Sequence, residues 1–217
     1  MELGPLPGGH HGLSREQILE SQRERLLAAI AEEVAERGYR GATITETVKR
    51  ASVSTRDFYE HFEGKEECFL AAFDAVRDHL EELIREAVAT QSDWPSQVVA
   101  GLRAALDFFA AEPDLARLCL VESVSATPTI AIRFRESVLA CVPALARGRA
   151  ESADGKALPP STEDSLLGGI VSLATRTTLA GGTDQLPALL PDLVEFTLAP
   201  YVGAEEAAGL AGDARAG

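Results

Sequence analysis

Apolar residues recur at intervals of three and four along most of the chain, which is the spacing of amphipathic helices. No stretch of useful length alternates with period two, so the pattern predicts an all-α fold without strands or internal repeats. The expected helices, about nine in number, span approximately residues 14–37, 44–50, 55–61, 65–89, 95–111, 113–124, 128–150, 162–180 and 185–198.

Residues 43–65 are the most informative stretch, because they predict two short helices joined by a tight turn. Thr43 with Glu46 three residues later has the form of a capping box, and Ser54 with Asp57 gives a similar start signal. Small residues at 51–53 suit the turn between them. This arrangement is typical of the helix-turn-helix unit, whose second helix enters the DNA major groove. The pattern therefore predicts binding to operator DNA.

The same stretch resembles a known protein family. The ordered residues that carry the likeness are Ala51-x-Val53-Ser54, Phe58-Tyr59-x-His61-Phe62 and Lys65-Glu66, preceded by Gly38-Tyr39. They are similar to the N-terminal DNA-binding domain of the TetR family of transcriptional repressors, over roughly residues 15–75. Two positions depart from the family pattern: Ser52 replaces the usual turn glycine, and Thr47 replaces a branched aliphatic residue.

Eight residues are candidates for DNA contact: Arg40, Thr43, Ser54, Thr55, Arg56, Tyr59, His61 and Lys65. Thr55 and Arg56 project early from the second helix, and a bidentate pair between Arg56 and guanine would contribute roughly 1–3 kcal/mol of discrimination. The alternatives for Arg56 are a phosphate contact, or contact with Asp57 and solvent alone. The resemblance implies that Tyr59 and His61 reach phosphate, and Lys65 and Thr43 are further phosphate candidates.

Four other residues of this stretch have a structural interpretation. Phe58 and Phe62 share one helical face, so we expect both in the core. Lys49 and Arg50 are expected on a solvated face of the first short helix.

The net charge of −14 at first contradicts DNA binding, but it is unevenly distributed. Residues 1–65 hold nine Lys/Arg and eleven Asp/Glu, a net charge of −2, whereas residues 66–217 hold eleven and twenty-three, a net charge of −12. DNA binding needs positive charge at the contact face and not over the whole molecule. An acidic second part can repel DNA elsewhere, or it can simply keep the protein in solution.

Composition predicts a disordered arm at 1–13 and a disordered tail at 203–217. The resemblance implies a helix-turn-helix DNA-binding domain at 14–65 and a helical effector-binding and dimerisation domain at 66–202. No run of eighteen apolar residues predicts a membrane span, and the N-terminus lacks the pattern of a signal peptide. Cys68, Cys119 and Cys141 show no C-x-x-C spacing and are expected as buried free thiols in a reducing cytoplasm.

The resemblance implies an effector pocket and a dimer interface in the second part of the chain. Residues that are candidates for lining the pocket are Trp94, Phe108, Leu118, Cys119, Glu122, Phe134, Leu173 and Arg176, with ordinary packing as the alternative for each. Arg176 is the most suggestive, since a cation in an apolar helix needs a partner, which is Glu122, an acidic ligand or solvent at the helix edge.

The helix at 162–180 contains Gly168 and Gly169 next to each other, although glycine in a helix interior costs roughly 1 kcal/mol relative to alanine. Paired glycines indicate close approach by another helix. With the apolar helix at 185–198, this stretch is expected to form a two-fold homodimer interface, spanning about residues 162–198; the alternative is packing within one subunit.

These observations favour a one-component transcription regulator, typically a repressor, that is released from a palindromic operator by a small apolar or amphipathic effector. An enzyme is disfavoured because no catalytic motif such as H-E-x-x-H, G-x-S-x-G or a P-loop is present, and no catalytic residue, metal site or cofactor is predicted. The remaining alternative is a helical interaction protein that keeps the helix-turn-helix unit without reading a specific operator.

Overall fold

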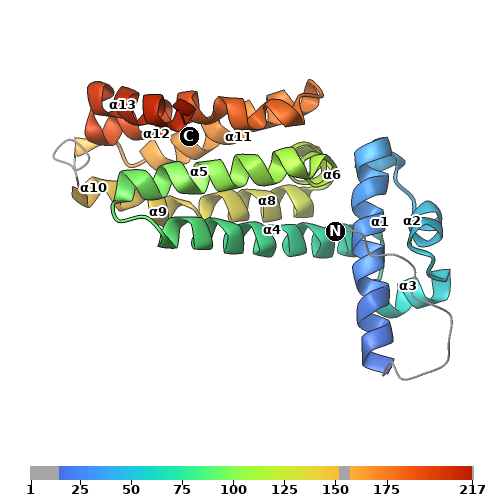
Figure 1. Cartoon of the computed structure of the whole chain (residues 1–217). Coiled ribbons are helices and arrows are strands. Elements are labelled where there is room, and N and C mark those ends of the chain that lie inside the picture. Colours follow the sequence, from blue (N-terminus) through green and yellow to red (C-terminus); the bar gives the residue numbers. More distant parts are fainter. Residues whose placement is uncertain (1–14, 152–156, 217) are drawn as a thin grey trace.

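A computed structural model describes residues 15–151 and 157–216, and within these ranges it consists of helices and contains no strand. Three helices form a unit at one end of the molecule, and the later helices run side by side away from it (Figure 1). We call residues Arg15–His61 the head and residues Lys65–Ala216 the body. The arm expected at 1–13 lies outside the described residues.

The head consists of α1 (Arg15–Gly41), α2 (Ile44–Ala51) and α3 (Thr55–His61). The expected end of the first helix at Gly38 is a break within α1, because Gly38 has φ 70° and ψ 162° and a further turn follows it. A positive φ of this kind favours glycine, since other residues meet their own Cβ there.

Helix α4 (Lys65–Ala89) leads from the head into the body, where α5 (Trp94–Ala111) lies beside it (Figure 1). The first half of α4 is buried through residues such as Phe69 and Phe73. The ring of Phe69 meets the ring of Tyr39 in α1 edge-on, with centroids 5.3 Å apart. One continuous core therefore extends from the head into α4.

The middle of the body contains shorter helices than its apolar pattern predicts. The expected helix at 113–124 is divided into α6 (Pro113–Ala116), a π-helix η1 (Arg117–Glu122) and α7 (Ser123–Ser125). The expected helix at 128–150 is divided into α8 (Pro128–Leu139), α9 (Val142–Ala146) and α10 (Gly148–Glu151). No single described helix is long and apolar enough to cross a membrane. Residues 113–125 and 128–150 together have the length and composition of a membrane span, but the two segments meet at a bend of 118°.

The last part contains α11 (Thr162–Leu179), a 3-10 helix η3 (Thr183–Leu189), α12 (Leu190–Val202) and α13 (Ala204–Ala216). The disordered tail expected at 203–217 is therefore wrong for residues 204–216, which form α13 against α12 (Figure 1). Ala207, Ala211 and Ala214 are buried at helical spacing, so small side chains allow the two helices to approach closely. Composition alone predicted disorder because this face consists of alanine.

Two free cysteines are buried as expected, but the third is not. Cys68 and Cys119 lie in the core, whereas Cys141 is exposed between α8 and α9. Burial raises the pKa of the Cys68 thiol to about 12, which keeps it protonated and unreactive.

A polar cluster ties together the helices at the end of the body farthest from the head. Arg149 of α10 donates to both carboxylate oxygens of Glu163 in α11, at 2.6 and 2.7 Å, and Tyr201 of α12 donates to Glu163 at 2.8 Å. Arg149 also donates to the carbonyls of Leu158 and Pro159. These hydrogen bonds, from Arg149 above all, lower the pKa of Glu163 to about 2.

We predict that Glu163→Gln lowers the free energy of unfolding at pH 7 by roughly 1–2 kcal/mol, after allowing for the partial exposure of Arg149. Because the folded pKa of Glu163 is depressed, its contribution is present above the unfolded pKa near 4.5 and is lost as the pH falls toward 2. The difference between wild type and variant in urea unfolding should therefore shrink between pH 5 and pH 2. A difference that stays constant with pH, or that equals the effect of Glu195→Gln on the exposed face of α12, contradicts this assignment.

Candidate nucleic-acid interface

Helix α2 begins as its sequence predicts. The Thr43 hydroxyl accepts a hydrogen bond from the N–H of Glu46 at 3.3 Å, so the expected cap is confirmed. Thr47, which stands in place of an aliphatic residue, is fully buried, and its hydroxyl donates to the carbonyl of Thr43 at 2.9 Å. A threonine is tolerated there because its polar atom bonds within the helix, and its β-branched shape fills the core.

The turn between α2 and α3 depends on one unusual backbone conformation and one arginine. Ser52 has φ 52° and ψ 45°, the left-handed conformation that glycine provides without strain. The guanidinium of Arg25 in α1 donates to the carbonyls of Ala51 and Ser52, at 2.9 and 3.3 Å. Arg25 thus holds the turn against α1. Sequence reasoning did not single out this residue, since its partners are backbone atoms distant in the chain.

Helix α3 has one buried and one exposed face. The Ser54 hydroxyl caps it by accepting from the N–H of Asp57 at 3.0 Å. Phe58 and Phe62 are buried, as predicted, whereas Thr55 and Arg56 are exposed at the start of the helix. The Arg56 side chain is 88% exposed, and its Nε lies 3.6 Å from a carboxylate oxygen of Glu60. Its ion-pair partner is therefore Glu60 and not Asp57. Base-reading side chains at the exposed start of a helix have the placement that major-groove recognition requires.

The other DNA-contact candidates differ in their exposure. Tyr59 is 56% exposed, although its ring meets the edge of Phe58. His61 is half-buried, with Nε2 3.4 Å from the Gln22 side chain in α1. Arg40 and Thr43 are exposed near the end of α1 and the start of α2.

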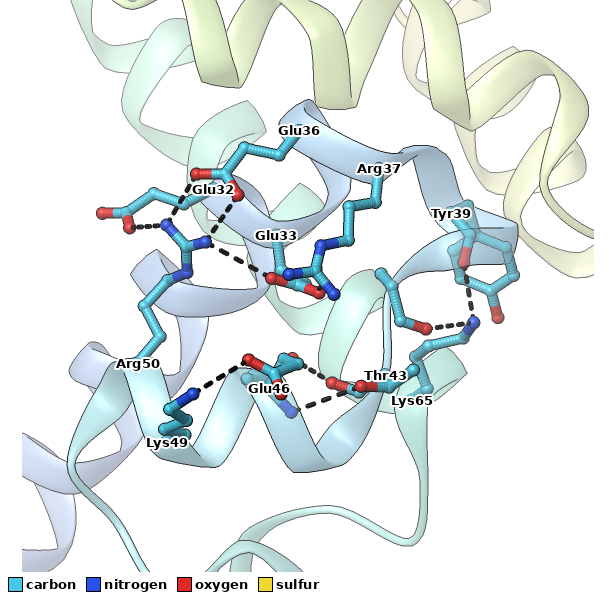
Figure 2. A network of polar contacts seen from close by, with 12 residues as sticks. Glu32, Glu33, Glu36, Arg37, Tyr39, Thr43, Glu46, Lys49, Arg50 and Lys65 are labelled. Carbon is cyan, nitrogen blue, oxygen red and sulfur yellow. Dashed lines mark hydrogen bonds and ion pairs between the residues drawn. The ribbon is translucent and has the colours of Figure 1, made fainter.

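Lys65 is engaged within the protein. Its ammonium group donates to the carbonyls of Tyr39 and Ala42, at 2.7 and 2.9 Å, and lies 4.4 Å from the centroid of the Tyr39 ring (Figure 2). Burial lowers the pKa of this group. The ammonium has three protons, so one is left for the phosphate contact that remains predicted.

Arg50 is exposed, as expected, but its guanidinium also has partners within the protein. Its guanidinium lies among three carboxylates of α1, with donor–acceptor distances of 3.0 Å to Glu32, 2.7 Å to Glu36 and 3.4 Å to Glu33 (Figure 2). Glu33 is fully buried, and its second oxygen lies 3.3 Å from Arg37 without hydrogen-bond geometry. A buried carboxylate requires a cation, so Arg50 joins α2 to α1. Lys49, in contrast, is solvated as expected and pairs only loosely with Glu46 at 3.6 Å.

The predicted pocket residues do not form one lining. Trp94 is buried, donates to the carbonyl of Ala144 at 2.9 Å and packs edge-on against Tyr201. Its ring occupies the space where a Cβ at Gly148 would lie, at 2.3 Å. The remaining apolar candidates are core or partly buried residues: Phe108, Leu118, Cys119, Phe134 and Leu173. Ordinary packing therefore accounts for these positions in this conformation.

The two charged pocket candidates lie apart. Arg176 is exposed on α11, so its side chain is surrounded by solvent at the helix edge. It does not pair with Glu122. Glu122 accepts a hydrogen bond from the backbone N–H of Tyr39 in the head, at 2.8 Å. Glu122 is therefore a contact between body and head.

Comparisons with known proteins match this architecture. A family model described as bacterial regulatory proteins, tetR family, matches residues 26–72, from the buried part of α1 to the first turns of α4. Residues 26–72, which include α2, α3 and parts of α1 and α4, therefore match the TetR family.

Two relatives in sequence are transcription regulators by name. The HTH-type transcriptional activator FasR of Mycolicibacterium smegmatis is 29% identical over 139 residues, 64% of each chain. The uncharacterized HTH-type transcriptional regulator YdgC of Bacillus subtilis is 30% identical over 100 residues, 44% of this chain and 51% of YdgC. The match thus spans less than two thirds of either relative.

Solved structures share the fold over most of the chain. The fatty acid degradation regulator FadR of Bacillus halodurans superposes with a TM-score of 0.69 at 18% identity, covering 82% of this chain and 97% of that one. The FadR of Bacillus subtilis in complex with stearoyl-CoA gives 0.69 at 16% identity, covering 83% and 98%. At these identities the likeness establishes the fold.

We predict that Ser52→Gly raises the free energy of unfolding by about 0.5–1 kcal/mol, because relief of the left-handed strain exceeds the added entropy of the unfolded chain. Ser54→Ala, two residues away, should lower it by about 1 kcal/mol through loss of the helix cap. Urea unfolding of both variants at one chain concentration checks the pair. Destabilisation by Ser52→Gly would show that the hydroxyl, and not the backbone conformation, matters at this position.

Proposed function

We propose that the chain is a dimeric, ligand-responsive transcription regulator that binds a palindromic operator. The observation that carries this proposal is the two-sided helix α3, in which Phe58 is fully buried while Thr55, Arg56 and Tyr59 are exposed. The capped helices on either side of the Ser52 turn give this face a fixed orientation. Residues expected to touch DNA are Arg40, Thr43, Ser54, Thr55, Arg56, Tyr59, His61 and Lys65.

The charge distribution supports a binding mode that is sensitive to salt. Arg56 pairs with Glu60 across one helical turn, and this exposed pair must open before Arg56 reaches a base. Exposed ion pairs of this kind contribute little, so opening is inexpensive. The acidic body repels DNA that approaches any part of the molecule other than the head. The affinity for DNA should fall steeply as the salt concentration rises.

A second copy of the chain is expected on α11 and α12. Gly169 is explained within one subunit, since a Cβ there would lie 2.9 Å from the Phe196 ring of the same chain. Gly168 has nothing within 4 Å of its Cβ position, so its outer face is open to another helix. Leu179 and Phe196 are 59% and 45% exposed on the same two helices. Small and apolar residues together suit a two-fold helical interface.

We further propose that the effector carries a long acyl chain. Support comes from the similarity to a regulator named for fatty acid degradation, and to the FadR of Bacillus subtilis, whose structure is a complex with stearoyl-CoA. Binding inside the body would separate the packed side chains at Trp94, Phe108 and Leu118 and favour a conformation with a different head position. Repression is the expected outcome of operator binding, and activation, the role named for FasR, is the alternative that the operator's place in the promoter decides.

We predict that selection from random duplex DNA yields a palindrome, and that Arg56→Ala blurs it at one symmetric position by roughly 1–3 kcal/mol of discrimination. Lys49→Ala is the matched control, because Lys49 is an exposed cation on α2 and should at most weaken binding uniformly. Selection with each variant at two salt concentrations measures both effects. A folded dimer that enriches no sequence would favour the helical interaction protein over the regulator.

We predict that Leu179→Glu and Phe196→Glu shift the chain toward monomer in analytical ultracentrifugation, because a buried unpaired carboxylate opposes association. Ile132→Glu is the control, since Ile132 on α8 is exposed to a similar extent, 52%, outside the proposed interface. If the α11 and α12 variants keep the mass of the wild type while Ile132→Glu dissociates the protein, the interface lies on α8 and the proposal is contradicted.

We predict that stearoyl-CoA weakens the complex with the selected palindrome about 5–150-fold, which is the usual range of such coupling. Free coenzyme A is the control, because it lacks the acyl chain. Fluorescence anisotropy of labelled DNA reports the change. Equal effects of the two compounds would contradict an acyl-chain effector.

A further inference from the structure

The end of α1 makes a polar contact with the body at the place where the helix is broken. Gly38 leaves the helical conformation, and the N–H of the next residue, Tyr39, donates to Glu122 Oε2 at 2.8 Å. The Glu122 carboxylate oxygens also lie 3.4 and 3.5 Å from the position of a Cβ on Gly38. The carboxylate thus caps the final turn of α1, whose first N–H groups would otherwise lack acceptors.

The same peptide segment is connected to the start of the other head helices. Lys65, the first residue of α4, donates to the carbonyls of Tyr39 and Ala42 (Figure 2). Ala42 precedes Thr43, which caps α2. A continuous series of hydrogen bonds therefore runs from Glu122 in the body, through the last turn of α1, to the starts of α2 and α4.

On the body side, Glu122 is the last residue of the π-helix η1. The hydroxyl of Thr175 in α11 donates to the carbonyl of Leu120 in this segment at 2.9 Å, and the Ser123 hydroxyl donates to the carbonyl of Leu118 at 2.8 Å. Conversion of the wide turn to α-helical register would rotate the following residue by about 100° about the helix axis. The direction of the Glu122 side chain therefore depends on the conformation of η1.

We infer that Glu122 is a positioning residue that fixes the orientation of the head relative to the body. This inference rests on the proposed operator binding for its functional consequence, but the orientation itself is a property of the free protein. A dimer reads two half-sites about one DNA turn apart, so both heads must be held at a set separation. Loss of the Glu122 contact leaves each α3 intact. The distance between the two α3 helices of the dimer then varies more widely.

The direct test measures the distance between head and body within one chain. One spin label is placed at Lys49→Cys on α2 and the other on the native exposed Cys141, and labelled protein is diluted with unlabelled chain. Pulsed electron resonance then compares wild type, Glu122→Gln, Glu122→Ala and the control Glu136→Ala, an exposed glutamate of α8. We expect a broadened distribution for Glu122→Ala, a smaller effect for Glu122→Gln, which keeps an acceptor oxygen, and the wild-type distribution for Glu136→Ala.

The functional readout compares the full palindrome with a single half-site. Glu122→Ala should weaken binding to the palindrome about 5–150-fold and leave half-site binding unchanged, because only the relative placement of the heads is lost. An unchanged distance distribution overturns the inference, and so does an equal loss on both DNAs, which indicates general damage to the head. If the distance distribution broadens but the protein selects no DNA sequence, the role of the Glu122 contact is supported. In that case only the proposal of operator binding is contradicted.

Discussion

Burial of Phe58 in the core of the head is the interaction on which the reading surface depends. Helix α3 has seven residues, and a helix of that length is not stable by itself in water. Its position is set by the fully buried Phe58 ring, by the Ser54 cap and by the Ser52 turn that precedes it. Because residues three and four apart share a helical face, burial of Phe58 and Phe62 leaves Arg56 and Tyr59 outside.

The head is held together by cations that bond to other elements of the fold as well as by its apolar core. Arg25 donates to the turn, Arg50 pairs with carboxylates of α1 around the buried Glu33, and Lys65 donates to carbonyls at the end of α1. These contacts fix the angles between helices, since each places a donor on atoms of a different element. Carboxylates offset the charge of Arg50, so a count of Lys and Arg overstates the positive charge that the head presents to DNA.

Local patterns made the head predictable, and distant contacts limited the rest. The Thr43 and Ser54 caps, the core phenylalanines and the break at Gly38 each follow from residues within one turn of each other. The contact of Glu122 with the head was not predicted, because Tyr39 lies far away in the chain and offers only a backbone N–H. Helix α13 was missed because its buried face is alanine, which has little weight in hydrophobic patterns but favours helix and close packing. Arg176 was overvalued, since the sequence alone could not show that its side of α11 faces solvent.

The contacts of the body with the head include the core shared by Tyr39 and Phe69, the packing of α6 and η1 against α1, and the polar contact of Glu122. A change in the packing of α11 against η1 can therefore reach the head without passing along α4. Coupling between sites needs an element with two discrete arrangements. Conversion of η1 from π-helical to α-helical register would supply a second arrangement.

We propose that α2, the Ser52 turn and α3 form the DNA-contacting surface. Hydrogen exchange of the full chain, with and without the duplex recovered by selection, tests this proposal most directly. DNA should protect amides between residues 43 and 65 and leave the exposed faces of α8 and α13 unchanged. Protection confined to the body, or none in residues 43–65 at saturating DNA, would contradict it.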